Sequence, residues 1–251
     1  NIQLPEGSLG KQTTTLNLGP THPATHGVFQ NILEMDGERI IDAVPTIGFI
    51  HRAFEKIAEH RPYYQITPLT DRLNYCSSPI NNMGWHMTVE KLIGIEVPER
   101  AQYLRVILCE LARISSHLLW LGTSALDTGA MSVFLYTFRE REAIYDVYEL
   151  VCGARFTVSY MRIGGVAVDV PLSFKPAVQN FIDDFARKID EYEILLTQNK
   201  IWRMRTEGIG VISAEKAIEY ALTGACLRGS GVDVDLRRDN PYLVYDRLDF
   251  D

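Results

Sequence analysis

The sequence predicts an α+β protein in which a small N-terminal antiparallel β-sheet is followed by a bundle of long helices. Two apolar segments flank the pair Asp36-Gly37, which favours a β-hairpin with strands near 28–35 and 38–44. After it, apolar residues recur at helical spacing in several stretches that are bounded by helix-start and helix-stop residues. A short sheet and three or four long helices therefore account for most of the chain.

The chain divides into three parts. Residues 1–15 are polar and rich in threonine, and we expect an extension that is mobile or bound to a partner. Residues 16–50 form the β-rich N-terminal region, and residues 51–251 form the helical bundle. The first residue is Asn rather than Met, and the stretch YDRLDFD has no helix-ending signal. We therefore expect the gene product to be longer, with a C-terminal part of the fold missing.

The spacing predicts helices in five stretches of the bundle region, of which three or four are long. Short helical pieces start near Phe54, and Pro62 and Pro68 interrupt them. The main helices are predicted over 80–94, 98–127, 132–162, 173–199 and 213–224. Gly94, the pair at 164–165 and Gly224 are the expected stops, Ser173 and Ser213 are the expected N-caps, and REREAIYDVYE should carry acid–base pairs on an outer face.

Charge and cysteine content exclude several classes of protein. The formal charge of −7 disfavours nucleic acid and anionic membranes as partners, because both attract basic surfaces. No apolar run reaches the roughly 18 residues of a membrane-spanning helix. The four cysteines form no C-x-x-C pair, so zinc and cluster motifs are disfavoured. Free thiols in a reducing compartment such as the cytoplasm are the expected state.

Three polar side chains on predicted loops could form a site for carbonyl chemistry. His26 lies in the Pro- and Gly-rich stretch LGPTHPATHG, Tyr75 in DRLNYCS and Asp127 in ALDTGAM. If the fold brings them together, the carboxylate could orient the imidazole while the phenol and the imidazole grip and protonate a carbonyl. His22 and His26 have the spacing of a metal motif, but Pro23 prevents the helix that would align them.

Each of these residues also has a plain structural interpretation. His22 could hydrogen-bond a backbone carbonyl, and Tyr75 could be a core tyrosine with a satisfied hydroxyl. Arg72 could form a salt bridge with the neighbouring Asp71, and Asp127 could cap the helix that follows.

Eight motifs make the chain, from about residue 16 to residue 251, closely resemble one family. They are GPTHPATHGVF, IGFIHRAFEK, LTDRLNYCS, SALDTGAM, REREAIYDVYELVCGAR, RIGGV, NKIWRMRTEGIGVIS and LRGSGVDVDLR. In order and spacing they are similar to the quinone-pocket subunit, the D-type subunit, of respiratory complex I, the proton-pumping NADH:quinone oxidoreductase. That family is related to the large subunit of nickel–iron hydrogenases, so the resemblance implies a hydrogenase large-subunit-like fold.

The resemblance implies roles for five residues. His26 and Tyr75 would bind the two carbonyl oxygens of a quinone headgroup, with Asp127 as the carboxylate behind His26. Arg52 and Arg72 would lie beside a 4Fe–4S cluster that a neighbouring subunit holds. The substrate would be a quinone, ubiquinone or menaquinone, and this chain itself would bind no metal or cluster.

The resemblance also implies partners and a location. The partners would be four other subunits of complex I: the cluster-bearing small subunit, the two-cluster subunit, the peripheral C-type subunit and the membrane-embedded H-type subunit. The chain would then be a peripheral membrane protein on the cytoplasmic side of the cell's inner membrane. Two alternatives stay open: a hydrogenase-related large subunit, which the missing C-x-x-C pairs disfavour because Cys76 stands alone, and a non-catalytic scaffold subunit of a membrane-associated redox complex.

Overall fold

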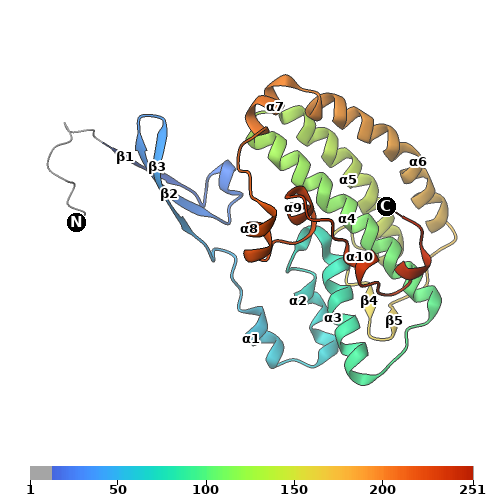
Figure 1. Ribbon diagram of the computed structural model, residues 1–251. Helices are drawn as coiled ribbons and strands as arrows, with labels where there is room; N and C mark the ends of the chain where they lie inside the picture. The colour runs from blue at the N-terminus through green and yellow to red at the C-terminus, as the bar shows by residue number, and fades with distance from the viewer. Residues whose placement is uncertain (1–12, 251) are drawn as a thin grey trace. The chain divides into compact units, whose positions relative to one another are not determined.

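The computed structural model describes residues 13–250, and the chain separates into two compact units that divide between Glu59 and His60 (Figure 1). The sequence-based division at residue 50 had assigned the short helix α1 (Phe54–Glu59) to the helical region, whereas its contacts place it in the first unit.

The first unit is built on a three-stranded antiparallel sheet. Strands β1 (Thr14–Leu18), β2 (Gln30–Asp36) and β3 (Arg39–Thr46) lie in that order, and Gly37 at φ 62° makes the predicted turn between β2 and β3. The predicted hairpin is confirmed, with boundaries shifted by about two residues.

The extension predicted over residues 1–15 is wrong at its end, where β1 begins. Thr14 pairs with Met35 and Thr15 with Glu34. Threonine is a good strand former because its branched side chain fits a pleated surface, so the threonine-rich stretch enters the sheet. Residues 1–12 lie outside the described part of the chain.

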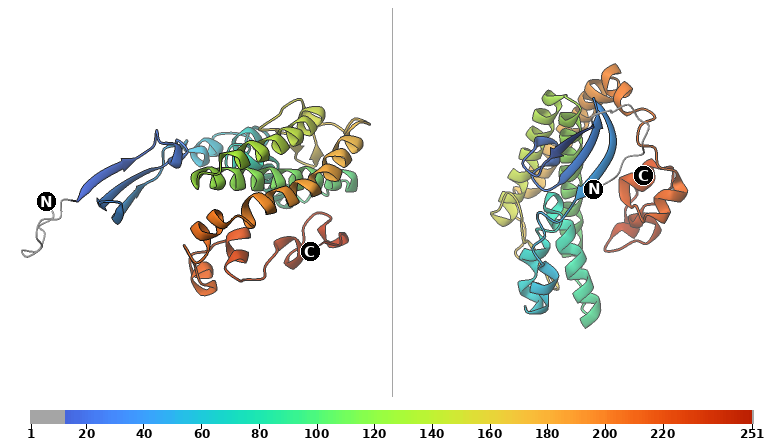
Figure 2. Two further views of the ribbon diagram at one scale, coloured as in Figure 1. Left: turned by 90° about the horizontal axis from the view of Figure 1, so that it is seen from above. Right: turned by 90° about the vertical axis from the view of Figure 1, so that its left-hand side faces the viewer.

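The second unit contains the expected bundle of long helices. They are α3 (Ser78–Ile93), α4 (Glu99–Asp127), α5 (Met131–Cys152) and α6 (Phe174–Tyr192). Helix α4 packs along α5, and α5 packs against α6 (Figures 1 and 2). The main core lies between these three helices and includes Leu108, Leu118, Ile144, Val147 and Phe181.

Helix α5 ends ten residues earlier than the sequence predicts. Gly153 at φ 73° closes it, and its backbone N–H bonds the carbonyl of Glu149 at 2.8 Å. A glycine in this left-handed conformation is the common C-terminal stop of a helix. The predicted stop at 164–165 instead lies in a hairpin formed by β4 (Met161–Arg162) and β5 (Gly165–Val166).

The remaining elements are short. They are α2 (Thr67–Thr70), α7 (Lys200–Thr206), α8 (Ala214–Glu219), α9 (Gly224–Gly229) and α10 (Leu236–Asp239), with 3₁₀ turns at Tyr63–Gln65, Tyr75–Ser77 and Tyr245–Arg247 and a π-helical turn at Glu193–Thr197. Ser213 caps α8 as predicted, whereas Ser173 makes no capping bond. Gly224 begins α9 rather than ending α8, since α8 already stops at Glu219.

A buried ion pair joins α3, α4 and the β4–β5 hairpin. Arg105 donates to the Glu90 carboxylate at 2.9 and 2.6 Å and to the carbonyls of Arg162 and Gly165 at 2.8 and 2.9 Å. The Glu90 carboxylate also accepts the backbone N–H of Gly164 at 2.7 Å. Both charges are compensated and hydrogen-bonded, as buried ions require.

None of the helices described between residues 13 and 250 combines the length and the apolar character needed to traverse a lipid bilayer.

Candidate functional site

His26 ends a tightly held loop of the first unit. A 3₁₀ turn, Pro23–Thr25, begins at His22, whose Nδ1 accepts the backbone N–H of Ala24 at 3.1 Å. The buried Thr25 hydroxyl donates to the His22 carbonyl at 2.9 Å. His22 therefore has a structural role as the N-cap of this turn. Its ring accepts a backbone N–H, whereas the structural interpretation expected it to bond a backbone carbonyl. His26 follows at φ 54°, and its imidazole is exposed at the surface of this unit.

Tyr75 lies on the 3₁₀ turn Tyr75–Ser77, and its side chain is 44% exposed. Its ring centroid is 6.2 Å from that of Phe156. Because Tyr75 is nearly half exposed, the alternative interpretation of Tyr75 as a buried core tyrosine is wrong. The phenol is thus placed where a ligand can reach it.

A buried aspartate anchors the segment that leads to Tyr75. The fully buried Asp71 carboxylate accepts the Asn82 side-chain N–H at 2.7 Å and both the backbone N–H and the hydroxyl of Ser159. The segment is therefore tied at once to α3 and to the stretch after α5, although these lie far apart in the sequence.

Behind Asn82 lies a buried histidine, His86, which was not among the residues predicted from the sequence. The His86 Nδ1 is 2.5 Å from the Asn82 carbonyl, which can only accept, so Nδ1 carries the proton. Nε2 then accepts the Thr67 hydroxyl at 3.1 Å. Burial lowers the pKa of His86, which keeps the ring neutral. His86 sits inside a helix, and no spacing of polar residues around it points to its role.

The two predicted arginines are both exposed. Arg72 donates to the Pro68 carbonyl at 2.7 Å, and the Asp71 carboxylate is occupied by Asn82 and Ser159, so the expected local salt bridge is replaced by these bonds. Arg52 lies in the first unit, just before α1. Both guanidinium groups are accessible to a partner.

Asp127 is the exposed last residue of α4. The next helix takes Ala130 as its N-cap. Between them the Thr128 hydroxyl donates to the carbonyls of Ser124 and Ala125 at 3.1 and 2.9 Å, and Arg205 of α7 donates to the Thr128 carbonyl at 2.6 Å. The turn that presents Asp127 is therefore fixed by bonds to two helices.

The three predicted quinone-site residues come from different parts of the fold. His26 lies in the first unit, whereas Tyr75 and Asp127 lie in the second. Their convergence on one ligand stays a prediction.

Arg141 of α5 is a further polar residue, linked to Tyr75 through Tyr145 and Phe156, and the predicted position on an outer face is wrong for it. Its side chain is buried, and it donates to the Ser115 hydroxyl at 3.3 Å and the Tyr145 hydroxyl at 2.5 Å. Tyr145 contacts Phe156 edge-on at 6.0 Å. The charged string REREAIYDVYE resembles a solvated face in sequence, because helical spacing does not show which side faces the core.

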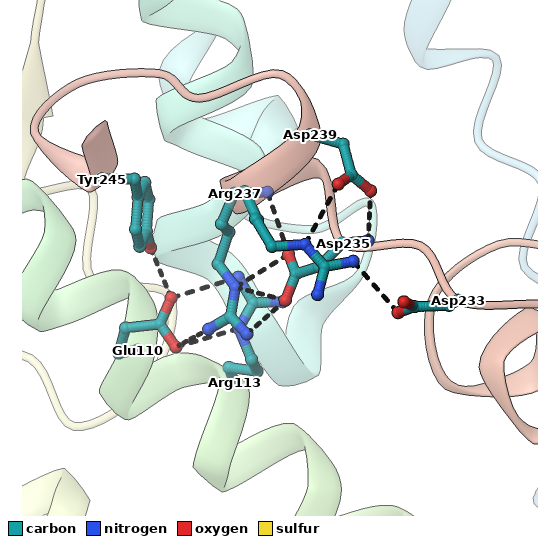
Figure 3. A network of polar contacts seen from close by, with 8 residues as sticks. Glu110, Arg113, Asp233, Asp235, Arg237, Asp239 and Tyr245 are labelled. Carbon is teal, nitrogen blue, oxygen red and sulfur yellow. Dashed lines mark hydrogen bonds and ion pairs between the residues drawn. The ribbon is translucent and has the colours of Figure 1, made fainter. Parts of the chain in front are cut away.

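A second polar network joins α4 to the C-terminal motif LRGSGVDVDLR (Figure 3). Glu110 accepts bonds from Arg113 at 3.0 Å, Arg237 at 3.1 Å and the Tyr245 hydroxyl. Burial favours the protonated acid, but these donors outweigh it and lower the pKa of Glu110. Arg237 also pairs with Asp235, and its hydrogen bonds lower the pKa of that carboxyl to about 2. This network fixes the tail against the bundle.

Metal ligands do not gather in the described part of the chain, where no three His, Cys, Asp or Glu side chains could hold one ion together. The four cysteines are free thiols, and Cys109 is the buried one among them. Burial raises the pKa of Cys76, while the nearby Arg141 charge lowers it in part.

Comparisons with known proteins identify relatives along nearly the whole chain. A family described as the 49 kDa subunit of respiratory-chain NADH dehydrogenase matches residues 127–251. The D-type subunit of NADH-quinone oxidoreductase from Flavobacterium johnsoniae is 59% identical over 242 residues, which are 96% of this chain and 58% of that protein. The corresponding subunit of Geotalea uraniireducens is 57% identical over 94% of the chain, and the one numbered 2 in Cytophaga hutchinsonii is 56% identical over 94%.

The chain spans about three fifths of the length of these relatives: 58% of the first protein and 60% of the other two. Identity at this level over 94–96% of the residues, together with the family match, agrees with the resemblance carried by the eight motifs. The chain belongs to the family of the D-type subunit of NADH-quinone oxidoreductase, the 49 kDa subunit of respiratory-chain NADH dehydrogenase.

Proposed function

We propose that this chain forms the quinone-reduction site of a proton-pumping NADH:quinone oxidoreductase. The observation that carries the proposal is its 56–59% identity, over nearly all of its length, to proteins named as the D-type subunit of NADH-quinone oxidoreductase. The Tyr75 phenol and the His26 imidazole are both exposed, and each lies on a hydrogen-bonded turn. Both side chains can therefore bind a ligand from outside the core.

In this proposal, His26 and Tyr75 hydrogen-bond the two carbonyl oxygens of the quinone headgroup. Reduction makes those oxygens basic, and the two side chains can then supply protons. Asp127 is the carboxylate that orients His26 and responds to its change in charge. This assignment requires the turn after α4 to approach the loop of the first unit in the assembled complex.

Arg52 and Arg72 are proposed to face a 4Fe–4S cluster held by a neighbouring subunit. Two guanidinium groups beside the cluster would stabilise its reduced form and so raise its potential. Both side chains are exposed and therefore available to such a neighbour. The further partners proposed are the two-cluster subunit, the peripheral C-type subunit and the membrane-embedded H-type subunit, with the chain peripheral on the cytoplasmic side of the membrane.

A variant of Tyr75 tests the proposal in the assembled complex. Tyr75→Phe removes one hydroxyl and keeps the ring contact with Phe156, so assembly should be unchanged while quinone reduction falls by roughly a hundredfold. Tyr220→Phe is the matched control, because that tyrosine is also exposed and belongs to no proposed site. Full quinone reductase activity in an assembled Tyr75→Phe complex would support a scaffold subunit instead.

His26 is tested in the same way with a neighbouring histidine as control. His26→Ala should abolish quinone reduction, whereas His22→Asn keeps an acceptor for the Ala24 N–H and should leave activity within about twofold. Elemental analysis of the purified complex addresses the hydrogenase-related alternative, which predicts stoichiometric nickel.

A further inference from the structure

The Arg141 guanidinium is a buried charge without a carboxylate partner in the described part of the chain. Its side chain is 4% exposed, and its two hydrogen bonds go to the neutral hydroxyls of Ser115 and Tyr145. Its other contacts are the faces of two rings, Phe138 at 4.7 Å and Tyr145 at 5.3 Å. Arg105 is buried to a similar degree, but it is paired with Glu90.

The acidic residues next to Arg141 in the sequence are engaged elsewhere. Glu140 pairs with Arg139 at 2.6 Å, and Glu142 pairs with Arg155. Arginine cannot give up its proton in a protein, so the charge of Arg141 persists despite its burial. Burying an uncompensated charge opposes folding, and a hydrophobic residue of similar size would be the more stable choice. A role other than stability therefore explains the residue better.

The field of this charge reaches the turn that carries Tyr75. Arg141 bonds Tyr145, Tyr145 contacts Phe156 at 6.0 Å, and Phe156 contacts Tyr75 at 6.2 Å. The charge also acts on the thiol of Cys76, the residue after Tyr75, by partly opposing the rise in its pKa. Positive potential in a poorly solvated region decays slowly with distance.

We propose that Arg141 is a positioning residue whose uncompensated charge, acting through the Tyr145–Phe156 layer, stabilises negative charge on the quinone bound at Tyr75. This inference rests on the proposed function. The reaction adds two electrons from the neighbouring iron–sulfur cluster and two protons to the quinone, giving the hydroquinone. Whenever an electron arrives before its proton, an oxygen becomes negative, and a fixed cation lowers the energy of that state without any rearrangement.

The sharpest test adds a counter-charge instead of removing the cation. Ser115→Asp places a carboxylate at the position that already accepts a bond from Arg141, and Ser115→Asn has the same shape without the charge. In the complete complex, Ser115→Asp should lower kcat for quinone reduction about tenfold with little change in KM, less than the loss of a direct oxyanion donor. Ser115→Asn should stay within about threefold of the parent. A purely structural Arg141 predicts the reverse order, since Asp would pair the buried guanidinium.

If the complex with Ser115→Asp fails to assemble, a second pair of variants, at Arg141 itself, tests the role of the Arg141 charge. Arg141→Met removes the charge and should lower kcat by about tenfold or more, while Arg141→Lys keeps it and should retain most of the activity. Equal kcat values for Met and Lys, or an unchanged kcat in Ser115→Asp, overturn the inference. Tyr75→Phe in the same assay separates the two proposals: if it is inactive while Ser115→Asp is fully active, only the role of Arg141 fails.

Discussion

Replacing Arg105 by Met tests the buried ion pair that joins α3, α4 and the β4–β5 hairpin. Without the guanidinium, the Glu90 carboxylate stays buried, and among residues 13–250 the Gly164 N–H is its one remaining hydrogen-bond donor. The carbonyls of Arg162 and Gly165 lose the donor that reaches them at 2.8 and 2.9 Å. Breaking a buried pair on one side typically costs about 3–5 kcal/mol, because it leaves an uncompensated charge.

We therefore expect Arg105→Met to lower the free energy of unfolding by about 4 kcal/mol. The double variant Arg105→Met/Glu90→Met removes both charges. Both variants take the Arg105 donor from the two carbonyls, so the double variant exchanges the uncompensated carboxylate for one unpaired N–H, that of Gly164, which costs about 1–3 kcal/mol before relaxation. It should consequently be more stable than the single variant, despite carrying one more substitution.

Urea unfolding of the purified chain at pH 7, followed by far-ultraviolet circular dichroism, measures these differences. Arg100→Met is the matched control on the same helix, because its pair with Asp169 is exposed and its loss should change the unfolding midpoint little. The reasoning is refuted if the double variant is less stable than Arg105→Met, or if Arg100→Met is as damaging.

Three further outcomes follow from the packing. Gly122→Ala places a Cβ against the Thr137 hydroxyl where α4 meets α5, and should lower the free energy of unfolding by about 1–3 kcal/mol. Gly84→Ala on α3 adds a Cβ in open space and should raise the free energy of unfolding by about 0.5–1 kcal/mol. Urea unfolding midpoints measure both changes. Ile144→Ala deletes a fully buried core side chain and should cost about 2–5 kcal/mol in the same assay. Burial lowers the pKa of His86 in the folded chain, so the unfolded chain binds a proton at this residue more readily. The folded state therefore has its full stability above the unfolded pKa of about 6.5 and loses stability as the pH falls below that value. His86→Gln should therefore narrow the difference between unfolding midpoints measured at pH 5 and pH 7.5, and an unchanged difference would contradict this account.

Local signals in the sequence were sufficient to predict most of the fold. The pair Asp36-Gly37 located the hairpin, and the apolar spacing over 98–127 placed α4 to within one residue. Where the prediction failed, two local signals competed. Apolar residues continue at near-helical spacing past Gly153, yet a glycine at φ 73° ends the helix there, because closing the helix end outweighs a continued apolar pattern.

Local sequence signals predicted less of the candidate site than of the fold. The pattern identified His26, Tyr75 and Asp127 as polar residues on loops, but their roles came from the resemblance to a family. Periodicity encodes which face of one element is apolar and says nothing about which distant residues meet. For the same reason it could not distinguish the buried Arg141 from its solvated neighbours in REREAIYDVYE.

The buried ion pair holds the β4–β5 hairpin through main-chain atoms of the hairpin. Arg105 reaches the carbonyls of Arg162 and Gly165, and Glu90 reaches the N–H of Gly164. These bonds do not depend on the identity of the hairpin side chains, whereas an insertion or deletion of a single residue would move the bonded main-chain atoms out of reach. For the ion pair, the length of this segment matters more than the identity of its side chains, while Met161 ties the same segment to the core through its buried side chain.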